Sequence, residues 1–512
     1  MPVRATVWRG FYQDSVVLMH VAAEVRALPG VRLAAALMGT PANHELLSSA
    51  GLATPDSKNA TAADLVLAVD AATDAEAEAA LAAAKGFFDE RRRARESTGR
   101  ALPRTLDGAL KQMPDANVAL ISVPGDYAKL EALTALRRGL HVFLFSDNVP
   151  VGDEVELKRL ALAQQRLCMG PDCGTAYLGG VGLGFANVVP RGRIGCVAAA
   201  GTGLQAVASH VATLGEGISH GIGVGGRDLS AEVGGMMTFF ALRKLADDPS
   251  TDAIVIIAKP PAPEVMPQLD AAIRTITKPV VVCALGAAVP ASAPATWVTT
   301  LEDAAEAAVA GIRGRAWTPR SFTDAAAVRS RVAAIAAGAR PRGALLGLFT
   351  GGTLAHEARV ILEPLVGPVN IDGAAPGSAH RVIDLGADEF TRGRAHPMID
   401  VAARDSRIRE AGAAADVAVL LVDLVLGRGA HPDPGPSLAA AIRDARATAE
   451  RDGRTLVAIA SVVGTDGDPQ GLARQIAELR AADVHVLPSS AQAARSAALV
   501  LDPRLASRLL SA

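Results

Sequence analysis

Two stretches of the chain repeat one pattern, in which apolar residues of strand length run into a glycine–threonine turn and then into a helical pattern. The first is GRIGCVAAAGTGLQAV, from Gly192 to Val207, and the second is GALLGLFTGGTLAHEARVI, from Gly343 to Ile361. Strands that alternate with helices along a chain are typical of a doubly wound parallel sheet. The repeat therefore predicts two related flavodoxin-like domains, each of which opens with a strand, a glycine turn and a helix.

Changes in this strand and helix pattern divide the chain into segments. The first segment has a βαβ…βα order, which predicts a small α+β module with ferredoxin-like connectivity. An arginine-rich stretch follows it, and then a Rossmann-like domain of alternating strands and helices. The predicted boundaries are 1–85 for the module, 86–110 for a basic linker, 111–192 for the Rossmann-like domain, 193–316 and 342–512 for the flavodoxin-like domains, and 317–341 for the linker between them.

The composition excludes several classes of function. Lys and Arg number 51 against 53 Asp and Glu, so the chain lacks the basic surplus that nucleic acid binding normally needs. No apolar run reaches the ~18 residues of a membrane span, and the N-terminus does not resemble a signal peptide. The 4 cysteines form no CxxC and no zinc spacing, which predicts reduced thiols, no metal and a cytoplasmic location.

The two glycine turns are candidates for an anion site. The N–H groups in the first turn of a helix have no intrahelical partner and carry partial positive charge, and glycine lets a ligand approach the backbone closely. Such turns favour phosphate or carboxylate, although a plain tight strand–helix connection has the same pattern. Neither turn is a P-loop, since no GK[ST] follows. The candidate anion-binding residues are Gly201, Thr202, Gly203, Gly351, Gly352 and Thr353.

Several motifs resemble the α-subunit of succinyl-CoA synthetase, namely GRIGCVAAAGT, GIGVGGRD, DDPSTDAIVIIAKPP and CMGPDCG. The block from 343 resembles the CoA-ligase domain at the end of the β-subunit, so the chain looks like a fusion of the two. The fusion, the additional N-terminal module and the stretch AHPMIDVAARDSRIREAG are more specifically similar to the FdrA family. The resemblance implies that the Rossmann-like domain is of the CoA-binding type, and that the two glycine turns aim two helix N-termini at one phosphate.

One departure from the resemblance matters for the reaction. Succinyl-CoA synthetases carry phosphate on a histidine that follows the strand resembling KPVVVCALG, whereas this chain has no histidine between His220 and His356. The nucleotide-binding half of the β-subunit is also absent from the sequence. FdrA-family proteins are associated with oxamate carbamoyltransferase, which converts oxalurate and phosphate to oxamate and carbamoyl phosphate in purine nitrogen catabolism. The resemblance therefore implies a carbamoyltransferase subunit without a phosphohistidine.

Two alternatives remain open at this stage. One is an acyl-CoA synthetase-like ligase subunit that binds CoA, and the other is a non-catalytic scaffold or regulatory subunit. No cofactor is certain; CoA is the candidate cofactor, and phosphate or carbamoyl phosphate is expected as substrate. The expected partners are a small ureido acid, phosphate and further subunits, in an oligomer without nucleic acid or membrane.

Other residues are weaker candidates. Two AHP triplets hold histidines that are able to act as acid or base, or to cap structure or face solvent. The candidate catalytic residues are His396, Arg394 and His431. The turn GPDCG is expected beneath the site, and Cys173 is interpreted as part of this structural turn rather than as a nucleophile. Asp228 and Asp423 each end a predicted strand, where they could either orient a ligand or cap a helix. The candidate ligand-binding residues are Gly225, Gly226, Asp228, Pro171, Asp172 and Cys173.

Overall fold

The computed structural model describes residues 2–11, 13, 15–97, 103–289, 294–337, 341–371, 379–391 and 395–510. The chain forms two compact units. The first comprises Met1–Met113 with Asp388–His396, and the second comprises Pro114–Ala387 with Pro397–Ala512. Each is described separately below.

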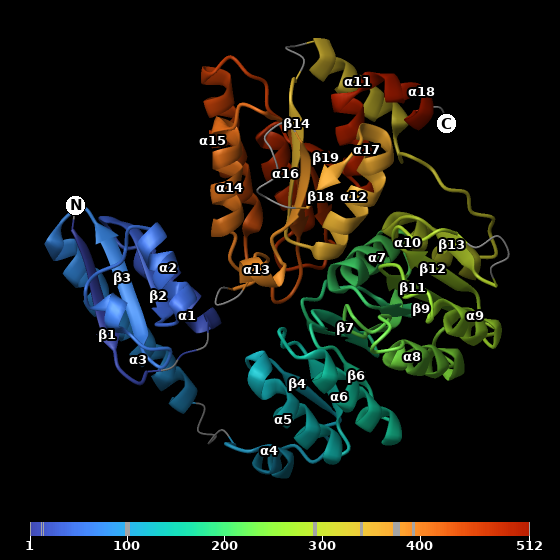
Figure 1. The fold of residues 1–512 in the computed structure, drawn as a ribbon, viewed down its shortest axis with the longest axis horizontal. Coiled ribbons are helices and arrows are strands. Elements are labelled where there is room, and N and C mark those ends of the chain that lie inside the picture. Colours follow the sequence, from blue (N-terminus) through green and yellow to red (C-terminus); the bar gives the residue numbers. More distant parts are fainter. Residues whose placement is uncertain are drawn as a thin grey trace. The chain divides into compact units, whose positions relative to one another are not determined.

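The first unit is a small antiparallel sheet with helices on both faces (Figure 1). The strand order is β1-β3-β2, and β3 pairs antiparallel with both neighbours. This agrees with the predicted α+β module, although the described residues include no fourth strand of a ferredoxin-like motif. Its elements are β1 (Val3–Trp8), α1 (Ser15–Arg26), β2 (Val31–Met38), α2 (Pro41–Ser49), β3 (Leu65–Ala71), α3 (Asp74–Ser97) and α4 (Leu106–Gln112).

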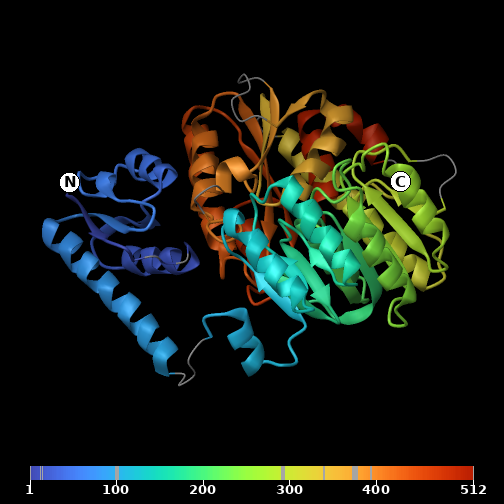
Figure 2. The same ribbon diagram turned by 60° about the horizontal axis from the view of Figure 1, so that its bottom comes forward.

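Alternation of side chains along the strands gives this module two apolar clusters. One lies between the sheet and helices α1 and α3, and includes Leu18, Val21 and Leu67. The other lies on the opposite face of the sheet, beneath α2, and includes Leu47 and Val66. α3 extends to Ser97, so the segment predicted as a linker from residue 86 begins inside a helix (Figure 2). Alanine and arginine favour helix, which accounts for the extension.

The second unit begins with a three-stranded parallel sheet in the order β4-β5-β6. This is the predicted Rossmann-like domain, but it ends earlier than residue 192. The hairpin of β7 and β8 joins the following sheet, because β7 pairs antiparallel with β10. The elements up to this hairpin are β4 (Val118–Ile121), α5 (Gly125–Arg137), β5 (His141–Leu144), α6 (Val151–Ala163), β6 (Cys168–Met169), β7 (Thr175–Leu178) and β8 (Val181–Gly184).

The first flavodoxin-like domain has the strand order β13-β12-β11-β9-β10, extended by the β7–β8 hairpin. Numbered from β9, this order is 2-1-3-4-5, the flavodoxin-like order. Its buried strands are continuous apolar runs, as expected for a parallel sheet covered on both faces. The elements are β9 (Arg191–Ala198), α7 (Gly201–Thr213), β10 (Ile218–Gly223), α8 (Met236–Asp247), β11 (Ala253–Ala258), α9 (Met266–Arg274), β12 (Val280–Ala284), β13 (Thr296–Val298) and α10 (Leu301–Ile312).

The second flavodoxin-like domain has the order β15-β16-β14-β17-β18-β19, all parallel, which repeats the flavodoxin-like order once the two-residue edge strand β15 is set aside. The predicted pair of related domains is therefore confirmed. The elements are β14 (Ala344–Phe349), α12 (Gly352–Val366), β15 (Val369–Asn370), β16 (His380–Asp384), α14 (Ala402–Ala413), β17 (Val417–Val425), α15 (Pro434–Arg451), β18 (Val457–Val463), α16 (Leu472–Ala481), β19 (His485–Leu487), α17 (Ser490–Leu501) and α18 (Ala506–Leu509). The short helix α13 (Asp388–Thr391) belongs to the first unit.

The two flavodoxin-like domains share one hydrophobic core. A single cluster of buried residues includes Val207 and Ala304 of the first domain and Leu354 and Ala497 of the second. The predicted linker at 317–341 contains a helix, α11 (Ala325–Ala337), which adds Val328 and Val332 to this core. Sharing a core fixes these two domains relative to each other.

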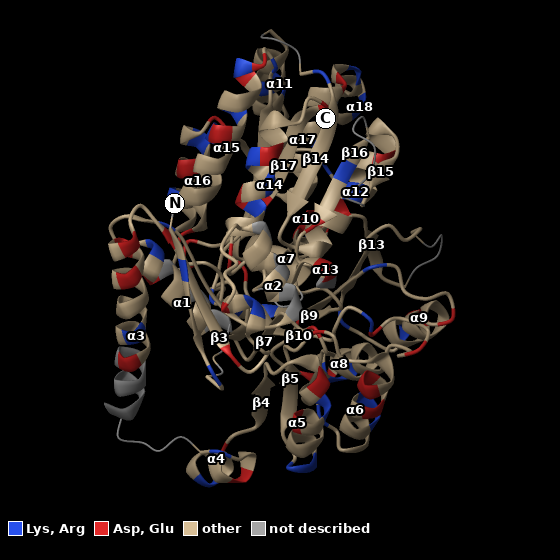
Figure 3. Ribbon diagram, turned by 60° about the vertical axis from the view of Figure 1, so that its left-hand side comes forward, with Lys and Arg blue, Asp and Glu red and all other residues tan. Residues whose placement is uncertain are grey.

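Charged residues of both signs are interspersed on the helices, and the strands carry few of them (Figure 3). This distribution agrees with the near balance of acidic and basic residues in the sequence. Among the described residues, no helix has both the length and the apolar composition needed to cross a lipid bilayer.

Candidate functional site

The first predicted turn opens helix α7 without a capping side chain. The N-cap residue Ala200 is extended, with φ −165° and ψ 108°, and offers no side-chain acceptor. The first turn of α7 contains no acidic residue, so its N–H groups have no carboxylate from their own helix. By contrast, the N-terminus of α10 is capped by the Thr300 side chain, which accepts from Asp303 N. The α7 N-terminus is thus available to an external acceptor.

The second predicted turn opens α12 and lies directly against the first. A methyl group placed on Gly351 would be 2.8 Å from Oγ1 of Thr202, and one placed on Gly203 would be 2.9 Å from Cγ2 of Thr353. Glycine is required at both positions because the two helix starts approach this closely. The structure therefore brings together two turns that lie far apart in the sequence.

The α12 turn differs from the α7 turn because two carboxylates already face it. Asp423 on β17 is fully buried, and its Oδ1 accepts from Thr350 N at 2.8 Å while its Oδ2 accepts from Gly351 N at 2.9 Å. Burial raises the pKa of the Asp423 carboxyl, although the charge of Arg404 and the hydrogen bonds from Thr350 and Gly351 act in the opposite direction. Asp384, at the end of β16, lies against Gly352, where an added methyl group would meet its Oδ2. The two turns are therefore not equivalent, and α7 is the less occupied anion site.

Arg404, near the start of α14, is a buried arginine that the sequence did not single out. Its side chain is 1% exposed, and its Nη1 donates to the backbone carbonyl of Asp423 at 3.0 Å. The same Nη1 lies 3.9 Å from Asp423 Oδ1. Its Nε and Nη2 have no hydrogen-bond partner among the described residues. These two atoms form the edge of a guanidinium that binds a carboxylate or phosphate side-on.

The turn from Pro171 to Gly174 lies beside the α7 N-terminus, as predicted. A methyl group on Gly201 would be 3.5 Å from Gly174 Cα, and one on Gly225 would be 2.5 Å from the Pro171 carbonyl oxygen. The backbones of these three segments therefore meet. Gly226 is exposed, and nothing lies within 4 Å of a methyl group placed there.

Within the same turn, Asp172 is exposed and Cys173 is buried. Burial raises the pKa of the Cys173 thiol well above its ordinary value. The thiol lies 3.4 Å from the backbone carbonyl of Gly223 and is not activated by a base. These surroundings agree with the reading of Cys173 as part of a structural turn.

Asp228 is a structural residue rather than a ligand-binding one, contrary to its place among the predicted ligand-binding residues. It is fully buried, and its carboxylate accepts from Thr238 N at 2.8 Å and Met237 N at 3.2 Å, which caps α8. Lys158 on α6 also donates to Asp228 at 2.7 Å and to Glu154 at 2.7 Å. A carboxylate with all these internal donors has little capacity left for a ligand.

The predicted catalytic residues belong to different parts of the chain. Arg394 lies outside the described residues, and His396 belongs to the first compact unit. His431 is half-buried in the second unit, where its Nδ1 accepts from Asp433 N at 3.1 Å. Burial lowers the pKa of His431, while the carboxylates of Asp400, Asp433 and Asp405 oppose that shift. His431 is thus held as a neutral side chain among acidic groups.

The loop that follows β12 would carry the phosphohistidine in succinyl-CoA synthetases. A histidine contacts this loop from another element: His356, on the second turn of α12, has its Nε2 3.1 Å from the Leu285 carbonyl oxygen. Its Nδ1 lies 3.4 Å from Nη2 of Arg359. Since the carbonyl accepts and the guanidinium donates, neither ring nitrogen of His356 presents a free lone pair.

One group of described residues has the composition of a metal site. His210, Glu302 and Glu306 place one ligand atom each within 4.8 Å of one another. However, Glu306 accepts from Trp317 and pairs with Arg320, and Glu302 accepts from Ser489 and Gln492. The carboxylates are already satisfied by protein donors, so the group functions as a polar contact between helices.

Comparisons with known proteins agree with this architecture. A model of the AllF heavy metal-associated domain matches residues 1–103, and a CoA-ligase model matches residues 348–500. A protein of Escherichia coli with the name uncharacterized protein YahF is 36% identical over 501 residues, which cover 96% of this chain and 97% of that protein. The chain belongs to the FdrA family.

The resemblance of this FdrA-family chain to succinyl-CoA synthetase is also borne out. The α-subunit of the ADP-forming succinate–CoA ligase of Methanothermobacter thermautotrophicus is 28% identical over 148 residues, which are 28% of this chain and 49% of that subunit. Among solved structures, the dinucleotide-forming acetyl-CoA synthetase 1 of Ca. Korarchaeum cryptofilum is 17% identical. That match covers 78% of this chain and 86% of the other, with a TM-score of 0.33. The CoA-ligase match over residues 348–500 and the similarity to the succinate–CoA ligase α-subunit show that the chain has the succinyl-CoA-synthetase-like fold and contains a CoA-ligase domain.

The name of the N-terminal family does not identify a metal site in this FdrA-family chain. Thiolates are the ligands that soft heavy metals prefer. The cysteines of the sequence are Cys168, Cys173, Cys196 and Cys283, and all lie outside residues 1–103. The donor set of the module therefore does not fit a thiolate-bound metal.

Proposed function

We propose that the chain is a subunit of a carbamoyltransferase of the oxamate carbamoyltransferase type, in which the α7 and α12 turns bind phosphate. The observation that carries this proposal is the contact of two helix N-termini, Thr202 against Gly351 and Gly203 against Thr353. Neither helix has a side-chain cap at its N-cap residue or an acidic residue in its first turn, and since Asp423 and Asp384 face the α12 turn, α7 supplies the more open donors. Helix N-termini of this kind favour an anion through backbone N–H donors and the helix dipole.

The reaction suits a site without a covalent carrier. An oxygen of phosphate attacks the ureido carbonyl carbon of oxalurate, and the bond from that carbon to the oxamate nitrogen breaks. The proton that phosphate gives up goes to the leaving nitrogen, so the products are carbamoyl phosphate and oxamate. The protein has to hold phosphate in place and stabilise the negative charge on the carbonyl oxygen, which backbone N–H groups are able to do.

Arg404 supports the same proposal from the substrate side. Oxalurate and oxamate each carry a carboxylate, and a guanidinium edge binds a carboxylate with two parallel hydrogen bonds. The Nε and Nη2 of Arg404 make no hydrogen bond among the described residues, although Nε lies 3.8 Å from Asp405 Oδ1, and the side chain is connected to the α12 turn through Asp423. The pair of turns would hold phosphate while Arg404 holds the organic acid.

A second candidate function is an acyl-CoA ligase-like subunit that binds CoA. The CoA-ligase match over residues 348–500 favours this alternative. Such a subunit would have to take its nucleotide chemistry from a partner, because no histidine lies between His220 and His356 to carry phosphate.

Activity assays separate the two candidates. The chain is combined with the other subunits of its complex and given oxalurate and phosphate, and carbamoyl phosphate is followed by ³¹P NMR. In parallel, the same mixture is given ATP, CoA and a small carboxylic acid, and ADP is measured. Carbamoyl phosphate that depends on this chain supports the proposal. CoA-dependent ADP without carbamoyl phosphate would replace it with the second candidate.

A binding assay on the chain alone tests the anion site itself. A ligand present at about 100 times its Kd adds about 2.7 kcal/mol to stability, so phosphate and carbamoyl phosphate should raise the melting temperature. Thr202→Val, which removes a hydroxyl at the start of α7, should reduce this shift. The matched control is Thr213→Val at the end of the same helix, where the hydroxyl donates to Ser209 O. Equal shifts in both variants would remove Thr202 from the site.

A further inference from the structure

The outer edge of β1 has no strand partner in the part of the module that the structure describes. β1 pairs with β3 through its inner edge only, in the order β1-β3-β2. An unpaired edge presents a row of backbone N–H and C=O groups that a further strand is able to bind. β1 is therefore a site for strand addition if its outward groups are accessible.

The hydrogen bonds to β3 identify the backbone groups that point outward. Ala71 N donates to the Pro2 carbonyl at 3.4 Å, so the carbonyl of Pro2 points toward β3. In an antiparallel strand the N–H and C=O of one residue point to the same side, and the side alternates from one residue to the next. Val3, Ala5 and Val7 therefore direct both of their backbone groups away from β3.

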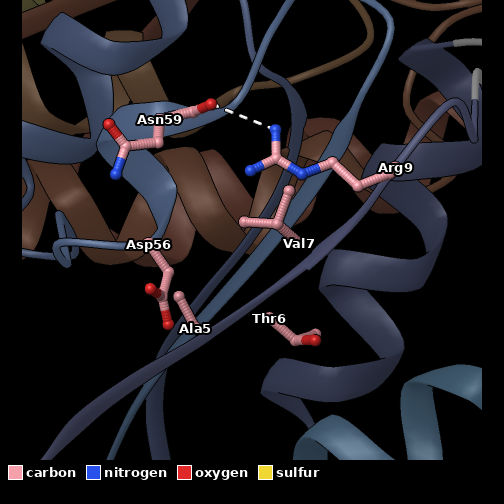
Figure 4. A pocket seen from close by; sticks show the side chains of 6 residues that line it. All are labelled: Ala5, Thr6, Val7, Arg9, Asp56 and Asn59. Atoms are coloured by element: carbon pink, nitrogen blue, oxygen red, sulfur yellow. Dashed lines mark hydrogen bonds between the residues drawn. The ribbon is translucent and has the colours of Figure 1, made fainter.

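A hollow lies beside two of these residues, Ala5 and Val7. It has a volume of 340 Å³ and is lined by Ala5, Thr6, Val7, Arg9, Asp56 and Asn59. Arg9 donates to the Asn59 carbonyl at 3.0 Å beside Val7, and Asp56 lies beside Ala5 (Figure 4). The side chains of Val3, Ala5 and Val7 are half-buried at the border of the apolar cluster on this face. Apolar side chains at an open edge leave surface that a partner strand would cover.

Within Val3–Trp8, β1 has no proline and no bulge, two of the features by which sheets protect their edges. Its register with β3 is continuous from Val3 to Trp8. The charged residue of the strand, Arg4, lies on the opposite face and pairs with Asp74 at 2.8 Å. The other edge strand, β2, has a register shift between Val31 and Leu33.

We propose that β1 is a dimerisation strand that pairs antiparallel with β1 of a second copy of this chain, around a two-fold axis at Ala5. A two-fold axis perpendicular to the sheet keeps each face on its own side, so residues opposite each other must share a face. Ala5 then faces Ala5 of the second copy, and Val3 faces Val7 of the second copy. Both members of each pair direct their N–H and C=O outward, so every pair forms two hydrogen bonds.

The side chains are also complementary in this arrangement. The pairs on the hollow side are alanine with alanine and valine with valine, which become buried together. On the other side Arg4 faces Thr6 of the second copy, so no like charges are opposite each other. A second copy therefore fits this edge better than a charged segment would.

Opposite charges at the two-fold axis test the proposal. Ala5→Lys and Ala5→Glu each place like charges face to face, and each should raise the dimer dissociation constant by about a hundredfold. An equal mixture of the two variants should restore the dimer, because unlike charges then meet. The full chain is measured by sedimentation velocity across a dilution series, and circular dichroism checks the fold. Arg32→Ala, on the opposite edge strand, is the control and should leave the dimer unchanged.

Several outcomes would overturn the proposal. These are a wild-type chain that stays monomeric throughout the series, a dimer that persists in Ala5→Lys and Ala5→Glu, and a mixture of folded variants that stays monomeric. Should both charged variants unfold the module, Ala5→Pro supplies the test. The N–H that proline lacks is one that points away from β3, so this variant should keep the sheet and lose the dimer.

Discussion

Glu357 is predicted to make the junction of α12 and α10 sensitive to pH. The side chain is 1% exposed, and Leu301 N at the start of α10 donates to its Oε1 at 2.7 Å. Burial raises the pKa of this carboxyl from its ordinary value of 4.5 to about 7, while Arg495 opposes the shift and Glu302 adds to it. Between pH 4.5 and about pH 7, Glu357 is therefore protonated in the folded chain and ionised in the unfolded chain.

The sign of the effect follows from this difference. Where the folded state binds more protons than the unfolded state, stability falls as pH rises. The contribution of Glu357 is complete below pH 4.5 and is lost as pH rises through about 7. The difference of about 2.5 pH units corresponds to about 3 kcal/mol. Glu357→Gln keeps an oxygen for Leu301 N and carries no charge, so it should abolish this loss.

The assay is thermal unfolding of the wild type and of Glu357→Gln at pH 5 and pH 8. At pH 5 both side chains are neutral in the folded chain and only the first part of the loss has occurred, so the melting temperatures should differ much less than at pH 8. At pH 8 the variant should melt higher by roughly 4 °C, the shift that about 3 kcal/mol produces when two domains of this size melt together. The control is Glu363→Gln on the same helix, where the carboxylate is 40% exposed and pairs with Arg359. The reasoning would be refuted if Glu357→Gln did not raise the melting temperature at pH 8, or if Glu363→Gln raised it by the same amount.

Three further predictions concern buried polar groups. Asp468→Ala should lower the unfolding free energy by about 3 kcal/mol or more in chemical denaturation, because Asn187 Nδ2 and Val188 N lose the carboxylate that accepts from them. Lys158→Met should destabilise the chain by about 3–5 kcal/mol, since it leaves two buried carboxylates without their cation; a stability equal to the wild type would mean that these carboxylates are neutral. All four cysteines are free and buried, so a thiol reagent should label none of them until the chain unfolds, and rapid labelling of Cys173 under native conditions would contradict its burial.

The parts of the fold that the sequence predicts are those that depend on local pattern. The apolar runs of β11 and β14 and the glycine turns before α7 and α12 are visible in the sequence, and both lead to the observed flavodoxin-like strand orders. That the two turns meet is implied by the resemblance to succinyl-CoA synthetase and not by the local pattern, because α7 and α12 follow strands of different sheets. What the pattern did not indicate is that Asp423 and Asp384 face one of them.

The errors in domain boundaries have local physical reasons. In the segment from Gly179 to Ala186 the apolar residues alternate with glycine, which is also typical of a glycine-rich loop, so the β7–β8 hairpin could not be assigned to the next sheet from sequence. Arginine-rich residues after 86 look like a solvated linker, yet alanine and arginine also continue α3 to Ser97.

The candidate site was predicted least well where it depends on partners from distant parts of the chain. Arg404 and Asp405 are adjacent charged residues in a polar helix, and nothing in the sequence indicates that both are buried. Asp228 could be read as a ligand because its partner Lys158 lies 70 positions away. A side chain's partner is fixed by the tertiary fold, so its role is the last property that sequence alone can supply.

The shared core of the two flavodoxin-like domains has a consequence for assembly. In succinyl-CoA synthetases the corresponding domains belong to separate polypeptides, whereas here one covalent chain carries both. Their association is therefore unimolecular, and the effective concentration of one domain around the other does not change on dilution. Lowering the amount of protein in a cell or a cuvette leaves the encounter of α7 with α12 intact, and only unfolding can separate them.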